Sequence, residues 1–524
     1  MQAPLSTVQS TIDLDIRKLP YFGLRSVVRM LFAFLASILV TLIFGTWAAK
    51  SQRAEKILIP LIDILQSVPV LGFLEMSAWL FIALFPSSQL GLECAAIFTI
   101  FTAQVWNMIL SFYQSLKTLP QNWQELANMY QLTAWQKFWR IEVPFAMPGL
   151  LWNTMMSLSA GWFFVVASEV VTISHHAYYL PGIGSYIAIA AQNEAVLPLI
   201  YAIGTMFIII LIYDQIFFRP ANYWVLQVSQ TPQQNPPWIM RLIRKSRIIQ
   251  YLPTHSLSQA WLSLWRHAPI QVKPRKHKSI LPSVLFTITI FLMILCSLWV
   301  IYYLYLHISI ESYFITLKLG FYTALRVFAL IVICLIVWVP IGIKIGQNPR
   351  VSSWLQPIIQ FLAAFPPPLL YPIFSYLIIR YQLNPNVWLS PLMILGTQWY
   401  ILFNVIAGTK SIPASTQAAM ELIGLKSWHK WSKWVIPSIF PSLVTGIITA
   451  SGGAWNASIE AEQVYWGHQT ISAQGLGTYI KQASSRGDAH DLALGIIMMC
   501  LWVFVINQLI WIPLYHMAQK RFRF

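Results

Sequence analysis

Two glutamates, Glu169 and Glu462, stand near the ends of long apolar stretches, and 293 residues separate them. A carboxylate inside a membrane is costly and commonly marks a transport pathway, although one near a helix end can instead reach water or pair locally. Both interpretations remain open from the sequence. Trp162 and Trp455 precede the two glutamates at the same spacing. These four residues are therefore candidates for lining or gating a pathway.

Two prolines, Pro69 and Pro366, also occupy equivalent positions in apolar stretches, and Pro366 opens a run of three prolines. A proline in a membrane helix frees backbone carbonyl groups and favours a kink. Such a kink could gate or line a pathway, or it could serve packing alone. We include both prolines among the pathway candidates.

These pairs correspond because the chain contains an internal duplication. Residues 106–220 align with 399–513 at a constant offset and without a gap. Identical pairs include Trp106 with Trp399, Lys117 with Lys410, Pro120 with Pro413, Trp135 with Trp428, Gly182 with Gly475, and Gly184 with Gly477. Upstream the offset grows by four residues, as for Arg29 and Arg326. A duplicated apolar module predicts a body of two similar halves with a site between them.

The composition excludes a water-soluble protein. Hydrophobic residues make up 57% of the chain and charged residues only 10%, a balance typical of membrane proteins. A helix needs about 20 apolar residues to cross the bilayer. Runs of this kind lie at 24–49, 69–86, 90–116, 149–173, 196–219, 283–306, 317–343, 358–379, 388–409, 442–465 and 491–514. The sequence predicts an all-α polytopic membrane protein with about eleven transmembrane helices.

The net charge of +17 is distributed unevenly between the loops. Basic residues follow alternate spans, whereas loops 86–93 and 174–195 contain no Lys or Arg. This positive-inside asymmetry places loops 117–148 and 410–441 in the cytoplasm. It also argues against nucleic acid as a partner, since the charge is not gathered into a binding patch.

The number of spans predicts that the two modules are parallel. The chain crosses the membrane six times between the two cytoplasmic loops, because helix 283–306 has no counterpart in the first half. The same count places residues 1–23 outside despite Arg17 and Lys18, a conflict that an upstream helix would resolve.

The predicted segments are an N-terminal segment (1–23), a first module (24–221), a basic linker (222–282), an extra membrane helix (283–307), a second module (308–514) and a basic cytoplasmic tail (515–524). The linker has nine Lys or Arg residues and no acidic residue. Its apolar face, Leu257, Trp261, Leu264 and Trp265, indicates an interfacial helix on anionic membrane lipids. Docking of a cytoplasmic partner is the alternative. The cysteines and histidines lack metal-ligand spacing, so no metal site is expected.

The two cytoplasmic loops are too long to be simple connectors, which usually have about two to eight residues. Each begins with a proline, continues through a helix-forming stretch and a turn, and ends in a basic, aromatic segment. Pro144 and Pro437 then precede the next span. This order predicts a helical hairpin on the cytoplasmic face, held there by the tryptophans Trp135, Trp139, Trp428, Trp431 and Trp434.

These loops resemble the signature of ATP-binding-cassette importer permeases: Glu-Ala-Ala, three residues, Gly, nine residues, then Ile-x-Leu-Pro. The first loop matches at Glu125, Ala127, Ile141 and Pro144, but Leu126 replaces an Ala and Gln131 replaces the Gly. The second loop matches at Ala419, Gly424 and Pro437, but Ala418, Met420 and Trp434 replace the Glu, an Ala and the Ile. Two imperfect copies at identical spacing are a far stronger signal than one.

The resemblance extends to the nitrate, sulfonate and taurine importer group, above all to its fused form. It rests on the stretch LDILQSVPVLGF, the Trp162–Glu169 region and the PGIG run at 181–184, and it covers about 24 to 514. It implies two parallel permease modules whose coupling helices, about 122–132 and 415–425, fit clefts of an ATP-binding-cassette ATPase dimer. Glu125 would cap its helix or pair with a basic residue of the ATPase.

The resemblance further implies a periplasmic solute-binding protein, facing loops 174–194 and 466–490, and a multi-pass location in a bacterial inner membrane. No phosphate-binding Gly-rich motif with Lys-Ser or Lys-Thr occurs, so ATP and Mg²⁺ are expected on the partner subunits and the chain is not an enzyme. The substrate implied is a small anion such as nitrate or a sulfonate. A secondary transporter with two parallel bundles is the alternative, and a membrane scaffold is a third possibility.

Overall fold

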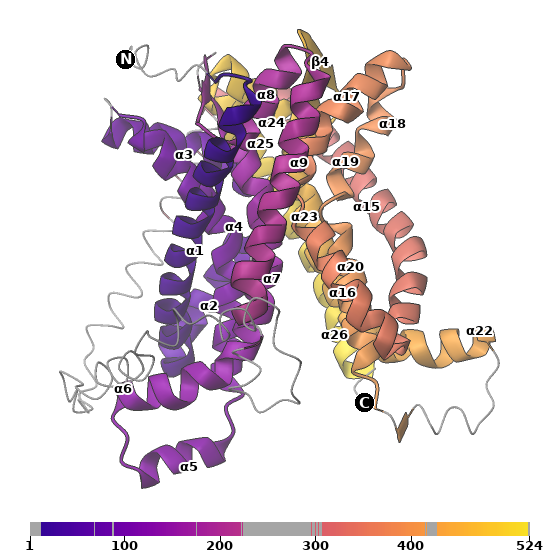
Figure 1. The fold of residues 1–524 in the computed structure, drawn as a ribbon. Helices are drawn as coiled ribbons and strands as arrows, with labels where there is room; N and C mark the ends of the chain where they lie inside the picture. Colours follow the sequence, from indigo (N-terminus) through magenta and orange to yellow (C-terminus); the bar gives the residue numbers. More distant parts are fainter. Residues whose placement is uncertain are drawn as a thin grey trace.

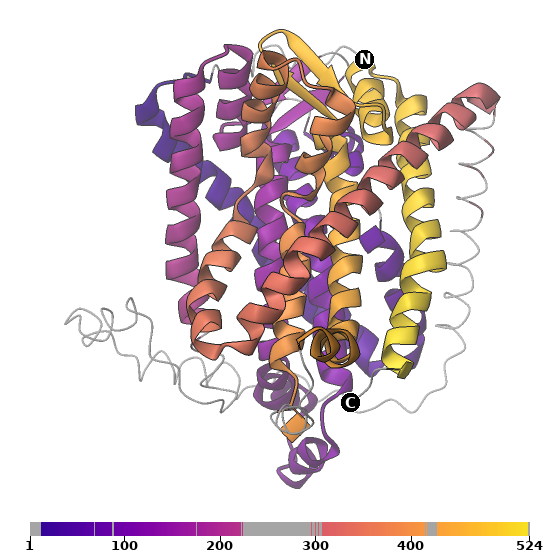
Figure 2. The same cartoon turned by 90° about the vertical axis from the view of Figure 1, so that its right-hand side faces the viewer.

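A computed structural model describes residues 12–221 and 306–521 apart from 68, 86–87, 174–175, 414 and 417–426, together with a few isolated positions between 223 and 302. The described chain is a bundle of long helices with two short β-hairpins at one end (Figures 1 and 2). The fold is therefore the predicted all-α polytopic class. The predicted linker helix at 257–265 and almost all of the extra span 283–306 lie outside the described residues.

The first half begins with a long helix and ends in a π-helical turn. Its elements are η2 (Ile16–Lys18), α1 (Leu19–Lys50), α2 (Gln52–Ser67), α3 (Val70–Leu84), α4 (Leu90–Lys117), α5 (Gln121–Met129), α6 (Ala134–Lys137), η3 (Phe138–Glu142), α7 (Val143–Ser168), β1 (Val170–Ile173), β2 (His176–Tyr179), α8 (Ile183–Gln192), α9 (Val196–Tyr213) and η4 (Asp214–Phe218).

The second half repeats this order. Its elements are α15 (Ile310–Gln347), α16 (Pro349–Ala364), η5 (Pro367–Leu370), α17 (Tyr371–Arg380), α18 (Pro385–Trp388), α19 (Ser390–Ile394), α20 (Gln398–Lys410), α22 (Ser427–Lys430), η6 (Trp431–Val435), α23 (Ile436–Ala461), β3 (Gln463–Trp466), β4 (Gln469–Ser472), α24 (Leu476–Arg486), α25 (Ala489–Ile506), η7 (Asn507–Trp511) and α26 (Ile512–Arg521).

The repeat extends to irregular details of the backbone. π-Helical turns lead into both α7 and α23, and two more begin at the matched residues Asp214 and Asn507. Each β-hairpin has four antiparallel residue pairs and directly follows the long helix that ends before Glu169 or Glu462. The hairpins were not predicted, because their short, mixed strands carry no clear period-two pattern.

Both modules point the same way. In Figure 1 the strands, α8 and α24 lie at the upper end, whereas α5, α6 and α22 lie at the lower end. The two loops predicted to be cytoplasmic therefore emerge from the same end of the bundle, as expected for parallel copies. The halves lie together at the strand end, where Gly467 N–H donates to the Ala191 carbonyl across 2.8 Å. They stand further apart at the α5 end.

Within the described residues, six helices are long and apolar enough to cross a membrane, and nine spans result if each of three bent pairs counts as one. The bend between Pro349–Ala364 and Pro367–Arg380 is 72°, at the place where Pro366 predicted a kink. In the first half Pro69 likewise precedes the start of α3. The two prolines therefore coincide with broken helices, since neither can donate a backbone hydrogen bond.

Candidate functional site

A buried ion pair in the first module joins α1 to the residue that follows α7. The guanidinium of Arg29, on α1, donates to a Glu169 carboxylate oxygen across 2.7 Å, and both side chains are at most 2% exposed. Ser26 Oγ and the backbone N–H of Gly184 donate to the same carboxylate. Glu93 binds the other edge of the guanidinium. We call this group the first anchor.

The second module contains the same arrangement with different partners, which we call the second anchor. Arg326 donates to Glu462 across 3.0 Å, and Thr323 and the Gly477 N–H donate to the same carboxylate. Asn386 replaces Glu93 as the second acceptor of the arginine. Each module thus satisfies its buried charges locally, as burial in a low-dielectric interior requires.

The anchors explain the glycines of the PGIG run and its counterpart. A Cβ on Gly182 would lie 2.2 Å from the Glu169 carboxylate, and one on Gly475 would lie 2.1 Å from the Glu462 carboxylate. These glycines permit the close approach of backbone and carboxylate. Sequence spacing alone does not reveal this, because the partners lie on separate elements.

The described pathway candidates therefore divide by location. Glu169 and Glu462 lie in the anchors. Neither is among the residues that line a cavity between the two modules. Trp162 and Trp455 are each 1% exposed in the core, and Trp162 contacts the Tyr213 ring edge-on. Trp162 also lines a second, smaller pocket together with Gln360 and Phe361 of the other half.

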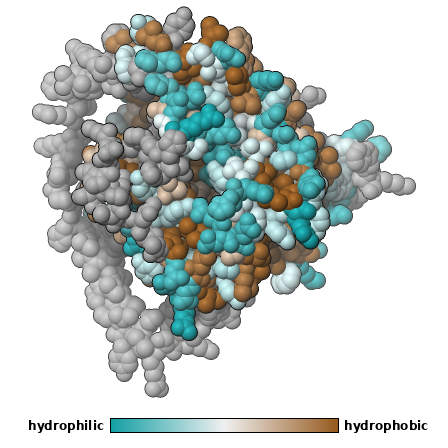
Figure 3. Space-filling view, turned by 90° about the horizontal axis from the view of Figure 1, so that it is seen from above, coloured by the Kyte–Doolittle hydropathy of each residue, from teal (hydrophilic) through white to brown (hydrophobic). Residues whose placement is uncertain are grey.

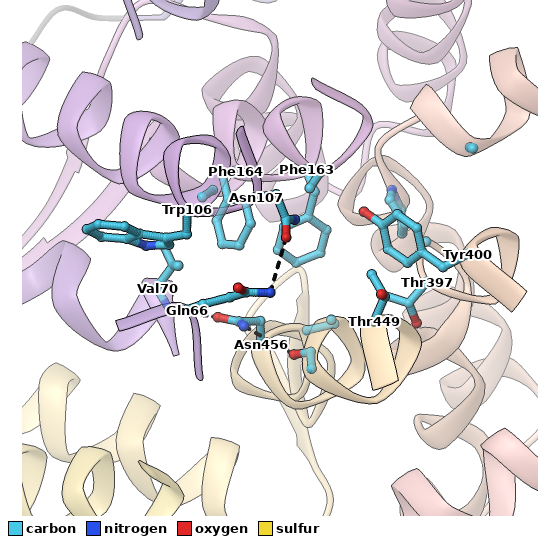
Figure 4. Close-up of a pocket in the computed structure, with 18 of the residues that line it drawn as sticks. Gln66, Val70, Trp106, Asn107, Phe163, Phe164, Thr397, Tyr400, Thr449 and Asn456 are labelled. Atoms are coloured by element: carbon cyan, nitrogen blue, oxygen red, sulfur yellow. Dashed lines mark hydrogen bonds between the residues drawn. The ribbon is translucent and has the colours of Figure 1, made fainter. Parts of the chain in front are cut away.

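A cavity lies between the halves and takes its walls from both (Figure 4). The centre of a water molecule can occupy about 150 Å³ of it. Its polar lining residues carry amide or hydroxyl groups, and no described lining residue is charged. The polar and aromatic members include Gln66, Thr102, Trp106, Asn107, Phe163, Phe164, Thr397, Tyr400, Thr449 and Asn456.

The broken helices border this cavity. Val70, the first residue of α3, and Pro367, the first residue of η5, both line it. The Val70 N–H donates to Asn456 Oδ1 of the other half across 2.6 Å. The predicted breaks at Pro69 and Pro366 thus place helix N-termini beside the cavity, where the positive ends of the helix dipoles lie.

The loop at 117–148 contains α5 and α6, which a turn joins, and α5 projects from the bundle below α6 (Figure 1). We call this segment the hairpin. Its small core joins Leu119, Ala127, Leu132 and Ile141, so two residues that match the permease signature pack together. Glu125 is exposed on α5. Pro144 lies at the start of α7.

Gln131 has a φ of 48°, a left-handed conformation that glycine adopts without cost. This is the position at which the permease signature has glycine. The turn is closed by Leu132 N–H, which donates to the Ala127 carbonyl across 3.0 Å. Gln131 therefore adopts the left-handed conformation although it is not a glycine, and this costs some backbone strain.

The base of the hairpin is fixed to the bundle by two ion pairs. Lys50 binds the buried carboxylate of Glu142 across 2.7 Å. Lys117 binds Glu55 across 2.7 Å, and its ammonium group holds the pKa of that carboxyl below its usual value. The hairpin is thereby linked to the ends of α1, α2 and α4.

Much of the second loop, including Ala418, Ala419, Gly424 and most of the expected helix 415–425, lies outside the described residues. Pro437 is placed in the first turn of α23, as Pro144 is in α7. Trp434 is 5% exposed and packs in the core. Its counterpart in the first loop, Ile141, is 6% exposed, whereas Trp135 at the start of α6 is 44% exposed.

A family model described as "Binding-protein-dependent transport system inner membrane component" matches residues 41–219 and again residues 338–522. The chain belongs to this family. The double match confirms the resemblance to importer permeases, the duplication and the multi-pass inner-membrane location.

Relatives of this permease family include transporters of small solutes. The chain is 26% identical over 181 residues to the nitrate import permease protein of Leptolyngbya laminosa, covering 34% of this chain and 58% of that protein. It is 28% identical over 138 residues to the bicarbonate transport system permease protein of Synechocystis sp., covering 26% of this chain and 47% of that protein. The taurine transport system permease protein of Escherichia coli is 24% identical over 170 residues, which are 32% of this chain and 58% of that protein. Such matches span about half the length of these relatives.

Sequence reasoning missed the polar residues of the cavity. Asn107, Thr397 and Asn456 are polar residues within predicted membrane spans, which is a usable signal because such residues seldom face lipid. The cavity is visible only in three dimensions, since equivalent positions of the two modules carry different residues there.

The first anchor generates a stability prediction. The variant Arg29→Leu should lower the free energy of unfolding by about 3–5 kcal/mol, because Glu169 would remain buried without its cation. The double variant Arg29→Leu, Glu169→Leu should lose less than the single one. Thermal unfolding in detergent, followed by size-exclusion chromatography, measures both. Equal or greater loss in the double variant would contradict the assignment.

The hairpin generates a second prediction. The variant Gln131→Gly should relieve about 1 kcal/mol of strain at the positive φ, and exchange of the Leu132 amide hydrogen should slow by about fivefold. Hydrogen-exchange mass spectrometry of peptides covering 126–133 provides the measurement. Asn128→Gly, within the helix, is the control and should accelerate exchange. Faster exchange in Gln131→Gly would show that the turn does not need this conformation.

Proposed function

We propose that this permease is the membrane subunit of an ATP-driven importer of a small anion, with separate ATPase subunits and a separate solute-binding protein. The observation that carries the proposal is a cavity between two parallel family modules, combined with a projecting hairpin at one end. The relatives named above, which are permeases for nitrate, bicarbonate and taurine, support the substrate class.

The coupling step is assigned to the hairpin at 117–148 and to its counterpart at 410–441. The first hairpin presents exposed residues of α5, among them Trp123, Glu125 and Met129, while its own core and base are fixed. A partner ATPase that grips α5 would therefore move α1, α4 and α7 as one body. ATP and Mg²⁺ would bind to the partner, and this chain would transmit the motion without catalysing a reaction.

The opposite end of the bundle is the proposed docking face for the solute-binding protein. Figure 3 shows this end, where hydrophilic side chains spread over much of the described surface. The two β-hairpins, α8 and α24 lie at this end (Figure 1), and the anchors beneath them hold the loops in place. This position agrees with the expected role of loops 174–194 and 466–490.

The described lining residues speak against the alternative of a proton-coupled secondary transporter. Such transporters bury ionisable groups beside the substrate to exchange protons, whereas the described lining of this cavity is neutral. The ion pairs of this chain lie in the anchors and at the base of the hairpin instead.

The combined variant Glu125→Lys, Gly424→Asp should abolish recovery of the ATPase in a pulldown of the tagged chain. The reason is that both changes place charge on the proposed coupling helices while leaving the membrane spans unaltered. The control is Glu311→Lys, at the exposed start of α15 and away from both loops, which should recover the ATPase normally.

Membrane insertion is verified by the yield and monodispersity of the purified variant. Undiminished ATPase recovery with the combined variant would reject the coupling assignment. Solute transport by the purified wild-type chain without any ATPase would reject the importer as a whole.

A further inference from the structure

We infer that the cavity between the modules is an anion-binding site built only from neutral donors, and that it favours monovalent over divalent anions. The inference rests on the proposed transport function and adds to it a location, a set of residues and a selectivity. Four groups from both modules carry it: the amides of Asn456 and of the Gln66–Asn107 pair, and the hydroxyls of Thr397 and Tyr400 (Figure 4).

The orientation of the Asn456 amide follows from chemistry. A backbone N–H can only donate, so the oxygen of Asn456 must face the Val70 N–H, 2.6 Å away. The amide nitrogen then faces the other way, where one N–H donates to the Gly452 carbonyl. The second N–H of this nitrogen is left for the cavity that Asn456 lines.

Gln66 and Asn107 are the amide side chains that the first module contributes to the lining. Gln66 Nε2 donates to Asn107 Oδ1 across 3.1 Å. An amide pair joined by one hydrogen bond retains one NH₂ group and one carbonyl group for other partners, whichever way the two amides are turned. This pair therefore adds a donor group and a single amide acceptor.

Thr397 supplies an unpaired hydroxyl group in the cavity wall. Its side chain lines the cavity and is 8% exposed, yet Oγ1 has no hydrogen-bond partner among the described residues. Buried hydroxyl groups are nearly always satisfied, because leaving one unpaired is costly. The hydroxyls of Thr102 and Thr449 differ, since they donate to carbonyl groups of their own helices. Thr397 Oγ1 has almost no surface open to the cavity, so a ligand would complete its bonding only after the side chain turned toward the cavity.

The broken helix of the first module adds a fixed positive potential. The N-terminus of the 15-residue helix α3 begins at the cavity wall, at Val70. A helix N-terminus favours a negative ligand. Because cavity-facing donors outnumber amide acceptors, a ligand that mainly accepts hydrogen bonds suits the site.

The lack of a cationic side chain in the described lining sets the selectivity. Nothing there neutralises a second negative charge, and the Born cost of burying an ion grows with the square of its charge. Nitrate and bicarbonate therefore suit this site, whereas sulfate and hydrogen phosphate do not. Binding by neutral groups is also weak, which allows the anion to leave the cavity toward the cytoplasm.

The test measures binding directly, in the complex of this chain with its ATPase reconstituted in lipid nanodiscs. Nitrate, bicarbonate and sulfate are titrated separately, and binding is read by calorimetry and by the rise in unfolding temperature. We expect at least one of the two monovalent anions to bind, and sulfate to bind at least about tenfold more weakly.

Three variants remove cavity-facing donors while preserving the fold. Asn456→Asp and Asn107→Asp keep the oxygen that accepts from Val70 or Gln66 and replace the NH₂ group with negative charge. Each should weaken monovalent anion binding by at least about tenfold. Thr397→Val removes only the hydroxyl group and should weaken binding by about tenfold.

The matched controls are Asn384→Asp, which adds one charge at an exposed helix cap, and Thr445→Val, an exposed threonine on α23 outside the cavity. Both should bind anions as the wild type does. The inference fails if neither nitrate nor bicarbonate binds at concentrations up to about 100 mM, if sulfate binds equally well, or if the cavity variants match their controls. ATPase recovery in these samples tests the proposed function separately, because no cavity variant touches the hairpins.

Discussion

The structure depends on one constraint: a charged or polar group in an apolar interior must find a partner within the protein. The pairs Arg29–Glu169 and Arg326–Glu462 meet it at equivalent places. Each draws together an early helix, the end of a long helix and the glycine loop after it. Because removing one member would strand a buried charge, these contacts position every element around them.

The same constraint distinguishes the rigid parts of the permease from the parts that bind ligands or partner proteins. At the anchors, described donors and acceptors are matched closely, and at the hairpin base Lys50 and Lys117 are paired with acidic residues. On α5, by contrast, the Glu125 side chain is exposed, and in the cavity wall the Thr397 hydroxyl has no hydrogen-bond partner among the described residues. Satisfied interiors resist motion, while incompletely satisfied surfaces are where ligands and partners bind.

Much of this architecture could be predicted from the sequence because it follows from composition and repetition. The offset between Trp106 and Trp399 predicted two modules, basic loops predicted their parallel orientation, and Pro366 predicted a break where the chain bends by 72°. The partners of Glu169 could not be predicted, since Arg29 lies 140 residues away and no spacing rule links them. The left-handed Gln131 was equally hidden, because the residue type does not indicate a positive φ.

The covalent fusion of two modules has a consequence for evolution at the cavity. Asn456 corresponds by the repeat to Phe163, Tyr400 to Asn107, and Ala363 to Gln66, and all six residues line the cavity. In a symmetric homodimer, any substitution would appear on both walls at once. A tandem gene removes that coupling, so one wall could acquire an amide while its twin kept a phenyl ring. A pocket whose two walls differ in this way can evolve only where the two halves mutate independently.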